Sequence, residues 1–232
     1  MDLGLYSGRL TGAVVYDLIT LKEKERDEWT VSPPLWILSD ELSESIRTGE
    51  LAKEFIKTMT ALWEKHGIVR REMTRIHGEH VIINPSLNWL GGSTVTWLKE
   101  VVDFSDIESG FFGRTIVIHG RRSGVPIYAP DTSLYPILLP YIKQKLEVIW
   151  GYEGEMMISD EAAAYEKHWY EVETKMEPGK SFLFPTWKRR LDIVHKFAML
   201  LQCSKGRVEG WNVIELSASK QAVVLYDDLL KH

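Results

Sequence analysis

The stretch that decides the expected fold is LWILSDE, residues 35–41. It is an apolar run that follows two prolines and ends at two adjacent carboxylates, Asp40 and Glu41. A run of this length is too short for an ordinary helix and is typical of a buried strand. Because ligands bind at the carboxyl ends of the strands in open parallel α/β sheets, we expect both carboxylates to lie where a ligand binds.

The two carboxylates allow two interpretations. In the functional one, Asp40 holds a Mg²⁺ ion, usually through water, and Glu41 orients or deprotonates an attacking water. In this form the stretch resembles the Walker B motif of the P-loop ATPases. In the structural one, the pair only ends a strand and caps the helix that follows. The stretch by itself leaves both interpretations open.

Composition limits the class of protein. The 232 residues suffice for one large domain, or for one and a half small ones. A net charge of −5 excludes a globally basic nucleic-acid binder, so any contact with DNA must come from a local patch. The single cysteine, Cys203, excludes an internal disulfide framework and suits a reducing cytoplasm. Because no apolar stretch approaches membrane-spanning length and the N-terminus has no signal-peptide pattern, we expect no membrane partner.

The spacing of apolar residues predicts most of the secondary structure. Helices are expected at residues 11–19, 49–65, 93–102, 134–150, 159–173, 186–204 and 211–231. Strands are expected at residues 35–41 and 115–118, with a loop at residues 85–92. A second loop at 120–132, rich in Gly, Pro and Arg, would separate an α/β part, residues 1–120, from an all-helical part, residues 121–232.

Residues 67–84 have the pattern of a β-hairpin with a tight turn that contains Gly78. The first arm holds three arginines, Arg70, Arg71 and Arg75. One interpretation is an edge hairpin whose charges prevent aggregation. The other is a basic loop that contacts nucleic-acid phosphates.

Two other motif-like features are set aside. The sequence PGKS at 178–181 has the ending of a phosphate-binding loop, but Thr174 occupies the position five residues before Gly179 where that motif needs another glycine. No other segment has the required form. His77 and His80 could coordinate a metal ion across the hairpin turn. The spacing suggests no third ligand, so we expect no such metal site.

The order of these features resembles the helicase-type P-loop ATPase region of phage and mobile-element replication proteins, many of which are primase-helicases. The matching segments, in chain order, are 35–41, the hairpin at 75–84, 85–88, SGFFGR at 109–114, 160–162 with Trp169 and Tyr170, and 190–207. They span most of the chain. The resemblance implies a partial P-loop core, with a mostly parallel sheet, flanking helices and a β-hairpin, followed by an all-helical C-terminal lid.

The resemblance implies roles for the residues around the carboxylates. Asp40 matches the aspartate that holds Mg²⁺, and Glu41 matches the glutamate that activates water. Asn84 or Asn88 follows the next core strand and matches the polar sensor of the γ-phosphate. The ligands of the completed site would be ATP and Mg²⁺.

Arg114 matches an arginine finger, which is supplied across a subunit interface and stabilises charge in the transition state. From the residues alone, it is equally a solvated or carboxylate-paired arginine at a strand entrance. Head-to-tail contacts of the finger type close into rings, so the resemblance implies a homo-oligomer, commonly of six subunits.

Two further sets of arginines match functional positions. Arg70, Arg71 and Arg75 fall where related helicases place a DNA-contacting loop in the central channel. In the helical lid, Arg189 or Arg190 matches a second sensor of the nucleotide.

The chain also departs from the family. The family has a strand, a Gly-Lys-Ser/Thr loop and a helix before the region that matches residues 11–19, and here Met1 comes after that part. Without the loop there is no nest of backbone N–H groups and no lysine for the phosphates. We therefore expect no ATP hydrolysis by this chain alone. The chain would be a fragment, half of a split protein whose partner supplies the loop, or a degenerate relative.

Two functions remain open, and both place the protein in the cytoplasm of a bacterial or phage-infected cell. The first is the Walker B, sensor and finger portion of a replicative helicase-type ATPase. The second is a non-catalytic DNA-binding or protein-interaction module derived from the same fold. In either case an absent first strand would leave an open sheet flank, which predicts association with a partner.

Overall fold

The computed structural model describes residues 4–6, 11–20, 32–45, 49–63, 68–74, 78–101, 110–118, 120, 128–129, 131–152, 154–175, 184–206 and 210–230. It divides into two compact units, Met1–Thr115 and Ile116–His232. Each unit has its own hydrophobic core.

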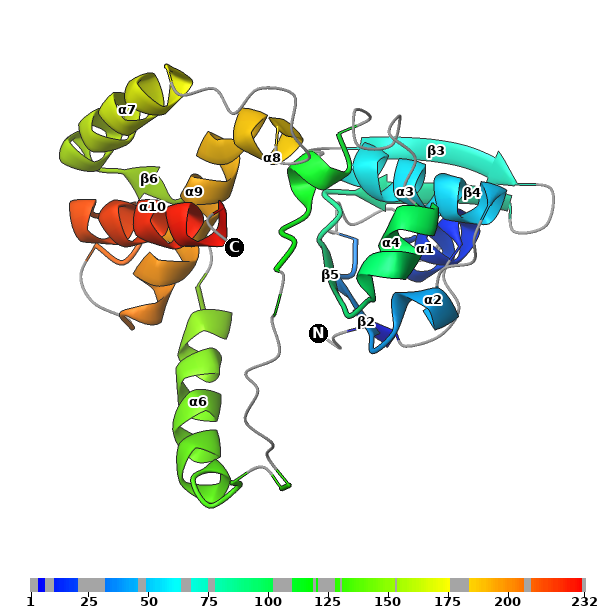
Figure 1. The fold of residues 1–232 in the computed structure, drawn as a ribbon, viewed down its shortest axis with the longest axis horizontal. Helices are drawn as coiled ribbons and strands as arrows, with labels where there is room; N and C mark the ends of the chain where they lie inside the picture. The colour runs from blue at the N-terminus through cyan, green and yellow to red at the C-terminus, as the bar shows by residue number, and fades with distance from the viewer. Residues whose placement is uncertain are drawn as a thin grey trace. The chain divides into compact units, whose positions relative to one another are not determined.

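The first unit is a mixed α/β body (Figure 1). Its elements in chain order are β1 (Gly4–Tyr6), α1 (Gly12–Ile19), β2 (Leu35–Ser39), α2 (Leu42–Ser45), α3 (Glu50–Leu62), β3 (Ile68–Thr74), β4 (Gly78–Ile83), β5 (Leu87–Gly91), α4 (Val95–Val101) and the 3₁₀ helix η2 (Phe112–Arg114). Strands β1, β2 and β5 form a parallel sheet in that order, and β3 pairs with β4 in an antiparallel hairpin. The predicted strand at residue 35 and the predicted hairpin are therefore confirmed.

β2 is the central strand of the parallel sheet, and its side chains alternate between two environments. Leu35 and Ile37 are buried in the core, whereas Trp36 between them is exposed. Successive residues of a strand point to opposite faces, so one face of the sheet packs inward and the other does not. The buried face packs against α1 and α3, which contribute Val15, Ile19, Phe55 and other apolar residues.

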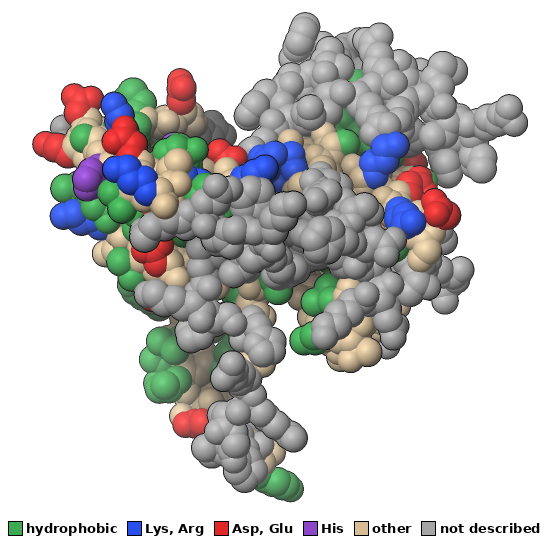
Figure 2. All heavy atoms as spheres, turned by 45° about the horizontal axis from the view of Figure 1, so that its top comes forward, with side chains coloured by type: hydrophobic (Ala, Val, Ile, Leu, Met, Phe, Trp, Pro, Cys, Tyr) green, Lys and Arg blue, Asp and Glu red, His purple; other side chains and the backbone are tan. Residues whose placement is uncertain are grey.

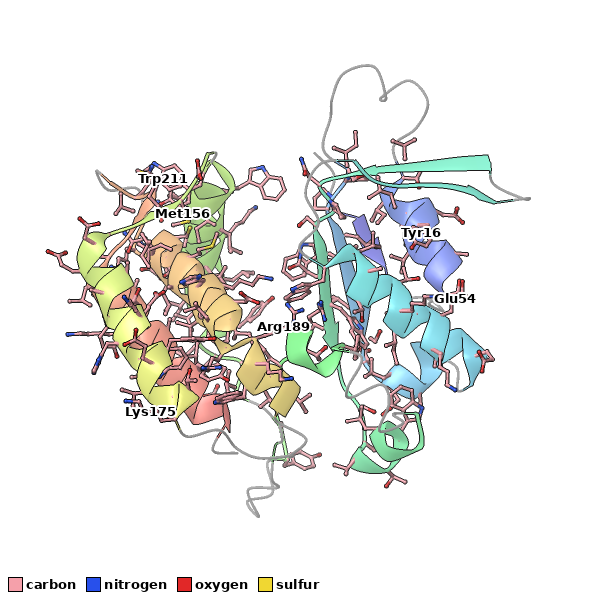
Figure 3. The ribbon with its side chains drawn as sticks, turned by 90° about the horizontal axis from the view of Figure 1, so that it is seen from above. Tyr16, Glu54, Met156, Lys175, Arg189 and Trp211 are labelled. Atoms are coloured by element: carbon pink, nitrogen blue, oxygen red, sulfur yellow. The ribbon has the colours of Figure 1, made fainter. Side chains whose placement is uncertain are left out.

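Helices α1 and α3 cover the same face of this sheet. Thr11 begins α1 as expected, because its hydroxyl oxygen accepts a hydrogen bond from the backbone N–H of Val14 at 3.2 Å. The two helices approach closely at Gly12, where a Cβ atom would lie only 2.6 Å from the Thr58 hydroxyl. Figure 3 shows Tyr16 of α1 and Glu54 of α3 on one side of the strands.

Two expectations about strands in this region were wrong. Residues 85–92 read as a loop because of their Pro and Gly content, but Leu87–Gly91 forms β5. Leu87 and Trp89 pack against the core, and this burial offsets the poor strand propensity of the flanking residues. Conversely, residues 115–118 are β-branched but form no strand, and Ile116–Ile118 are exposed. Such residues favour a strand only where a neighbouring strand offers hydrogen bonds, and the described residues offer none here.

The second unit is mainly helical. Its elements are α6 (Tyr135–Trp150), β6 (Met157–Ile158), α7 (Asp160–Thr174), α8 (Phe184–Lys188), α9 (Arg190–Ser204), β7 (Val213–Ile214) and α10 (Leu216–Leu230). Helices α7, α9 and α10 share a core that includes Trp169, Val194 and Tyr226. The unit was expected to be all-helical, but it also contains β6 and β7, which pair in parallel. The helix predicted at 186–204 is in fact two helices, α8 and α9, separated at Arg189.

Helix α6 differs from the other helices of this unit because it buries no residue. Its exposed apolar side chains include Ile137, Leu138, Tyr141 and Leu146. Figure 2 shows hydrophobic side chains on this helix toward the bottom of the view. Among the described residues, no helix is both long and apolar enough to cross a membrane.

Candidate functional site

The candidate site lies at the carboxyl end of β2. Ser39 is the last residue of this strand and pairs with Gly91, the last residue of β5. Asp40 follows directly, so it lies at the edge where both parallel strands end. This is the edge at which open α/β sheets bind their ligands.

Gly92 joins the two strand ends through backbone hydrogen bonds. Its N–H donates to the carbonyl oxygen of Ser39 at 2.9 Å, and its own carbonyl accepts from the N–H of Leu42 at 2.8 Å. A Cβ atom at this position would lie 2.7 Å from the carbonyl oxygen of Asp40, which is closer than backbone atoms allow. Only glycine lets the segment after β5 approach the segment after β2 this closely.

The two carboxylates have different surroundings. Asp40 is exposed, and within the described part of the chain its carboxylate has no hydrogen-bond or ion-pair partner. Glu41 is half-buried, and its Oε1 accepts from the backbone N–H of Ser43 at 3.5 Å. A contact of that length is a weak hydrogen bond. Glu41 is therefore a weak cap of the helix that follows, as the structural interpretation expected. Asp40 makes no such contact, and its carboxylate faces solvent.

Two hydroxyl groups at the same edge were expected from the sequence only as caps of the helix at 93–102, and no role in the site was assigned to them. Ser93 and Thr94 follow Gly92, which is bonded to the end of β2, and both are exposed. The Thr94 hydroxyl oxygen accepts from the N–H of Trp97 at 3.2 Å and so caps α4. The Ser93 hydroxyl makes only a long contact, 3.4 Å, with the Thr94 carbonyl. Residues 92–94, Gly-Ser-Thr, directly follow β5, but this signal could be used only once Leu87–Gly91 was known to be a strand.

The structure does not bring Asn84 or Asn88 to this edge. Asn88 pairs in register with Trp36, the second residue of β2, whereas Asp40 follows the last residue of that strand. At about 3.3 Å per residue the two lie roughly 13 Å apart along the sheet. Asn84 is exposed, has a φ of 47° and precedes β5, so it too belongs to the opposite end of the sheet. The prediction of Asn84 took the hairpin strand β4 as the neighbour of β2 in the parallel sheet. The neighbour of β2 is β5.

Arg114 ends η2 and is held locally. Its Nη1 donates to the carbonyl oxygen of Gly110 at 2.6 Å, and Gly110 has a φ of 87° that favours glycine. Phe111, between them, packs against Trp89 of β5 with ring centroids 5.9 Å apart. The guanidinium is therefore half-buried and fixed to the first unit. No strand follows it, contrary to the expected strand entrance.

The second strand of the hairpin, β4, is hydrogen-bonded to the segment just before β2. The carbonyl oxygen of Ile83 accepts from the N–H of Ser32 at 2.8 Å, and the N–H of Ile83 donates to the Ser32 hydroxyl at 2.9 Å. Arg70 and Arg71 lie in β3, in register with Ile82 and Val81. Their side chains, the whole of Arg75, and the turn with His77 lie outside the described residues, as does the side chain of His80.

Arg190 does not fit the role of second sensor. It is 1% exposed, and its guanidinium lies 4.0 Å from the ring centroids of both Tyr170 and Trp187. Nη1 donates to the Trp187 carbonyl at 2.9 Å, and Nη2 donates to the Thr174 hydroxyl at 2.5 Å. These contacts give Arg190 a structural role inside the second unit. Arg189 is half-buried and pairs with Asp192 at 3.4 Å.

A second cluster of ionisable groups lies where α7, α9 and α10 meet. Glu166 is 2% exposed, and its Oε1 accepts from the Ser219 hydroxyl at 2.6 Å. Its Oε2 lies 2.5 Å from Nε2 of His195. The hydrogen bond to Glu166 raises the pKa of His195, partial burial opposes this, and the charges of Glu166 and Asp192 add to the rise. The carboxylate lies between hydroxyl and imidazole, so this is not the order of a catalytic triad, in which the imidazole is in the middle.

The donor set at the strand end fits one kind of metal binding only. No group of three or more His, Cys, Asp or Glu side chains that could hold a metal ion is found among the described residues. A site formed by protein ligands alone is therefore not supported there. Mg²⁺, however, is usually bound by one or two carboxylates together with waters and substrate phosphates. Asp40 meets that requirement, provided that a nucleotide supplies the phosphates.

Comparisons with known proteins give limited further information. No protein-family model matches the sequence, and no curated protein matches it. Among solved structures, one that is similar is a full-length MCM homologue from Methanopyrus kandleri, with 18% sequence identity and a TM-score of 0.43. The alignment covers 84% of this chain and 37% of that one, so this chain spans just over a third of that protein. A TM-score of this size supports no argument about this chain. The description of the fold therefore relies only on the chain's own strands and helices.

Proposed function

We propose that the first unit supplies the Mg²⁺-holding and water-activating part of a nucleoside triphosphate site in a DNA-helicase-type ATPase. The observation that carries the proposal is the position of Asp40 and Glu41 at the carboxyl end of the central parallel strand. An exposed aspartate there, with no partner among the described residues, is available to an ion and its phosphates.

Each carboxylate has its own role in this proposal. Asp40 holds the Mg²⁺ of the nucleotide, directly or through water, and the ion, when bound, neutralises charge on the phosphate oxygens. Glu41 orients a water and takes its proton as the water oxygen bonds to the γ-phosphorus. The bond between that phosphorus and the β-phosphate bridging oxygen breaks, which gives ADP and inorganic phosphate.

The Ser93 hydroxyl takes the position that sequence reasoning gave to Asn84 or Asn88. It follows the neighbouring strand β5 and is brought beside the end of β2 by the bonds of Gly92. A hydroxyl can donate a hydrogen bond to a phosphate oxygen. We assign it the role of polar contact to the γ-phosphate.

The remaining parts of the proposed site come from outside this chain or from arginines elsewhere in it. The sequence contains no phosphate loop, so the proposal requires one from a polypeptide segment outside these 232 residues. Arg114 would act as the finger toward the nucleotide of a neighbouring copy, which makes the active form a ring. Arg70, Arg71 and Arg75 of the hairpin would contact DNA phosphates in the channel of that ring. Use in phage or mobile-element replication is part of the same proposal.

Nucleotide binding tests the proposal. Titration of the chain with ATP should show binding that is stronger in the presence of Mg²⁺, and Asp40→Ala should abolish the effect of Mg²⁺ while leaving the fold intact. A matched control is Glu171→Gln, which changes an exposed carboxylate on α7 in the other unit. Equal Mg²⁺-dependent binding by wild type and Asp40→Ala would contradict the proposal.

A second candidate function is a non-catalytic DNA-binding or protein-interaction module of the same fold. The observation that favours it is the weak helix-capping contact of Glu41 with Ser43, which gives one carboxylate a structural use. The two candidates differ in one measurable respect. A non-catalytic module would bind DNA, or a protein partner, with no change on Asp40→Ala, and would not bind ATP.

A further inference from the structure

Helix α6 has one apolar side that runs along its whole length. At 3.6 residues per turn, Leu138, Ile142 and Ile149 fall on this side. The opposite side carries Pro136, Pro140, Lys143 and Glu147. An amphipathic helix of this kind normally packs its apolar side against a core. In α6, however, none of the residues is buried.

Among the described residues, α9 covers the C-terminal end of this apolar side. α6 packs mainly against α9, and its half-buried residues are Lys145, Val148 and Ile149. Toward the N-terminus the same side is open, because Leu138 is 47% exposed and Ile142 is 48% exposed. In Figure 1 this end of α6 extends away from α9. The open part therefore continues an apolar surface that is packed further along the helix.

The open part belongs to a large apolar patch. Its exposed side chains are those of Leu134, Tyr135, Ile137, Leu138, Leu139, Tyr141, Ile142, Leu146 and Trp150. Because each of them is 44–69% exposed, the patch measures on the order of 1,000 Å². The largest apolar patch on a typical monomer is roughly 300–600 Å². A standard protein–protein interface uses about 800 Å² of each partner, so the patch is large enough for one half of a stable interface.

The chemistry of the patch favours a second copy of the same chain as its partner. The stretch from Thr132 to Ile142 contains no charged residue. Charged groups at an interface select a partner with the opposite charge. An apolar surface without charges provides no such selection, and it is complementary to itself across a two-fold axis. The interfaces of homodimers are also more apolar than those of non-obligate complexes.

We propose that the N-terminal half of α6 is the contact through which two copies of this chain pair across a two-fold axis. The two helices would run antiparallel, with Leu138 of each copy facing Ile142 of the other. Tyr135 and Tyr141 would lie at the rim of the contact, where their hydroxyl groups stay in water. The prolines and the charged residues on the opposite side of the helix would remain outside the contact.

This contact differs from the finger contact of the proposed function. A finger contact is head-to-tail, joins different surfaces of the two copies and builds a ring. The α6 contact is symmetric and uses the same surface on both copies, so it depends neither on a nucleotide nor on Arg114. The two proposals can therefore fail separately.

Self-association of the full chain measures the α6 contact. Sedimentation velocity without nucleotide should show wild type as a dimer of 26.7-kDa chains at about 10 μM. Leu138→Glu with Ile142→Glu should raise the dissociation constant roughly 100-fold, because charges would be buried at the centre of the contact. The matched control, Leu200→Glu with Val224→Glu, changes exposed apolar positions on α9 and α10 and should leave the dissociation constant unchanged. A monomeric wild type, with the patch covered by another part of the chain or by a different protein, or equal dissociation constants for the two variants, would overturn the inference.

Disulfide cross-linking tests the antiparallel arrangement without introducing a charge. Two chains that both carry Cys203→Ser are mixed, one with Leu138→Cys and the other with Ile142→Cys. Oxidation should give mainly the mixed disulfide between positions 138 and 142, because the two-fold axis brings these positions within reach of each other. Preferential linkage of like positions, or no linkage between copies, would contradict the arrangement. Arg114→Ala should leave the yield of the mixed disulfide unchanged, and a lower yield would assign the contact to the ring instead.

Discussion

The backbone N–H of Gly92 donates a hydrogen bond to the carbonyl oxygen of Ser39 at 2.9 Å. This bond fixes Gly92, the first residue after β5, against the end of β2 and the backbone of Asp40. The candidate site is therefore formed by backbone contacts that need a glycine.

Gly92→Ala should destabilise the first unit. The added Cβ atom would lie 2.7 Å from the Asp40 carbonyl oxygen, which belongs to the backbone and cannot rotate away. We expect a loss of about 1–3 kcal/mol in the free energy of unfolding, measured by urea titration with tryptophan fluorescence. Gly120→Ala is the control, because no described residue comes within 4 Å of a Cβ atom there, and it should change stability by less than about 0.5 kcal/mol. Equal effects would show that the close approach at Gly92 is not rigid.

Arg190→Ala should destabilise the second unit by about 2–4 kcal/mol, because it removes a buried side chain packed between two rings together with its hydrogen bond to the Trp187 carbonyl. Arg190→Lys should restore little of this loss, since an ammonium group cannot stack on two rings and donate a fork of hydrogen bonds. Arg189→Ala, at a half-buried ion pair, should cost less than about 1 kcal/mol. Thermal unfolding followed by circular dichroism measures all three. A stable Arg190→Ala protein would mean that the guanidinium is not needed for packing.

The stability of the second unit should fall as pH rises past the usual pKa of histidine. The folded-state pKa of His195 is raised above 6.5, chiefly by its hydrogen bond to Glu166. A raised pKa means that the folded state binds the proton more tightly, so its stabilising effect is complete below about pH 6.5. The effect is then lost as pH rises through the higher folded-state value.

Urea unfolding at pH 6 and pH 8.5 checks this dependence. The wild type should lose stability between the two values, and His195→Phe should lose less, because it has no proton to release. Asp192 also faces His195, so Asp192→Asn should reduce the dependence without removing it. A wild type that is equally stable at both pH values would refute the role of this pair.

The hairpin arginines should control the salt dependence of DNA binding. In the proposed function Arg70 and Arg75 contact phosphates, and each lost phosphate contact lowers the slope of log K against log salt by about 0.9 on duplex DNA. Arg70→Ala with Arg75→Ala should therefore reduce this slope by about 2, measured by fluorescence anisotropy. Lys53→Ala with Lys57→Ala removes two exposed charges from α3 and is the matched control. The same slope for wild type and the arginine variant would remove the hairpin from the DNA-contacting surface.

The sequence predicts regular elements well where one interaction dominates. The strand at residue 35, the hairpin, and the helices capped by Thr11 and Ser159 follow from apolar spacing and from side-chain caps, which act locally. β5 was missed because its stability comes from Leu87 and Trp89 packing on a distant core, and Gly91 hides that signal. The strand expected at 115–118 failed for the opposite reason, since composition cannot supply a neighbour.

The candidate site was predicted only in part. Asp40 could be located, because an aspartate after a buried strand must lie at the strand end. The polar residue proposed after the neighbouring strand, Ser93, could not be located from the sequence. Its location required knowing that β5 rather than β4 belongs to the parallel sheet. The burial of Arg190 depends on nearby Trp187 but also on Thr174 and Tyr170, which lie 16 and 20 positions away, and no local pattern reveals those two contacts.

The central claim is that Asp40 binds the metal ion of a nucleotide, and the most direct measurement is the effect of Mg²⁺ on ATP affinity. Calorimetric titration of wild type, Asp40→Asn and the control Glu171→Gln would be made with and without Mg²⁺. We predict that Mg²⁺ raises ATP affinity roughly tenfold, about 1.4 kcal/mol, for wild type and Glu171→Gln and has no effect on Asp40→Asn. The same Mg²⁺ effect in Asp40→Asn as in wild type would contradict the account.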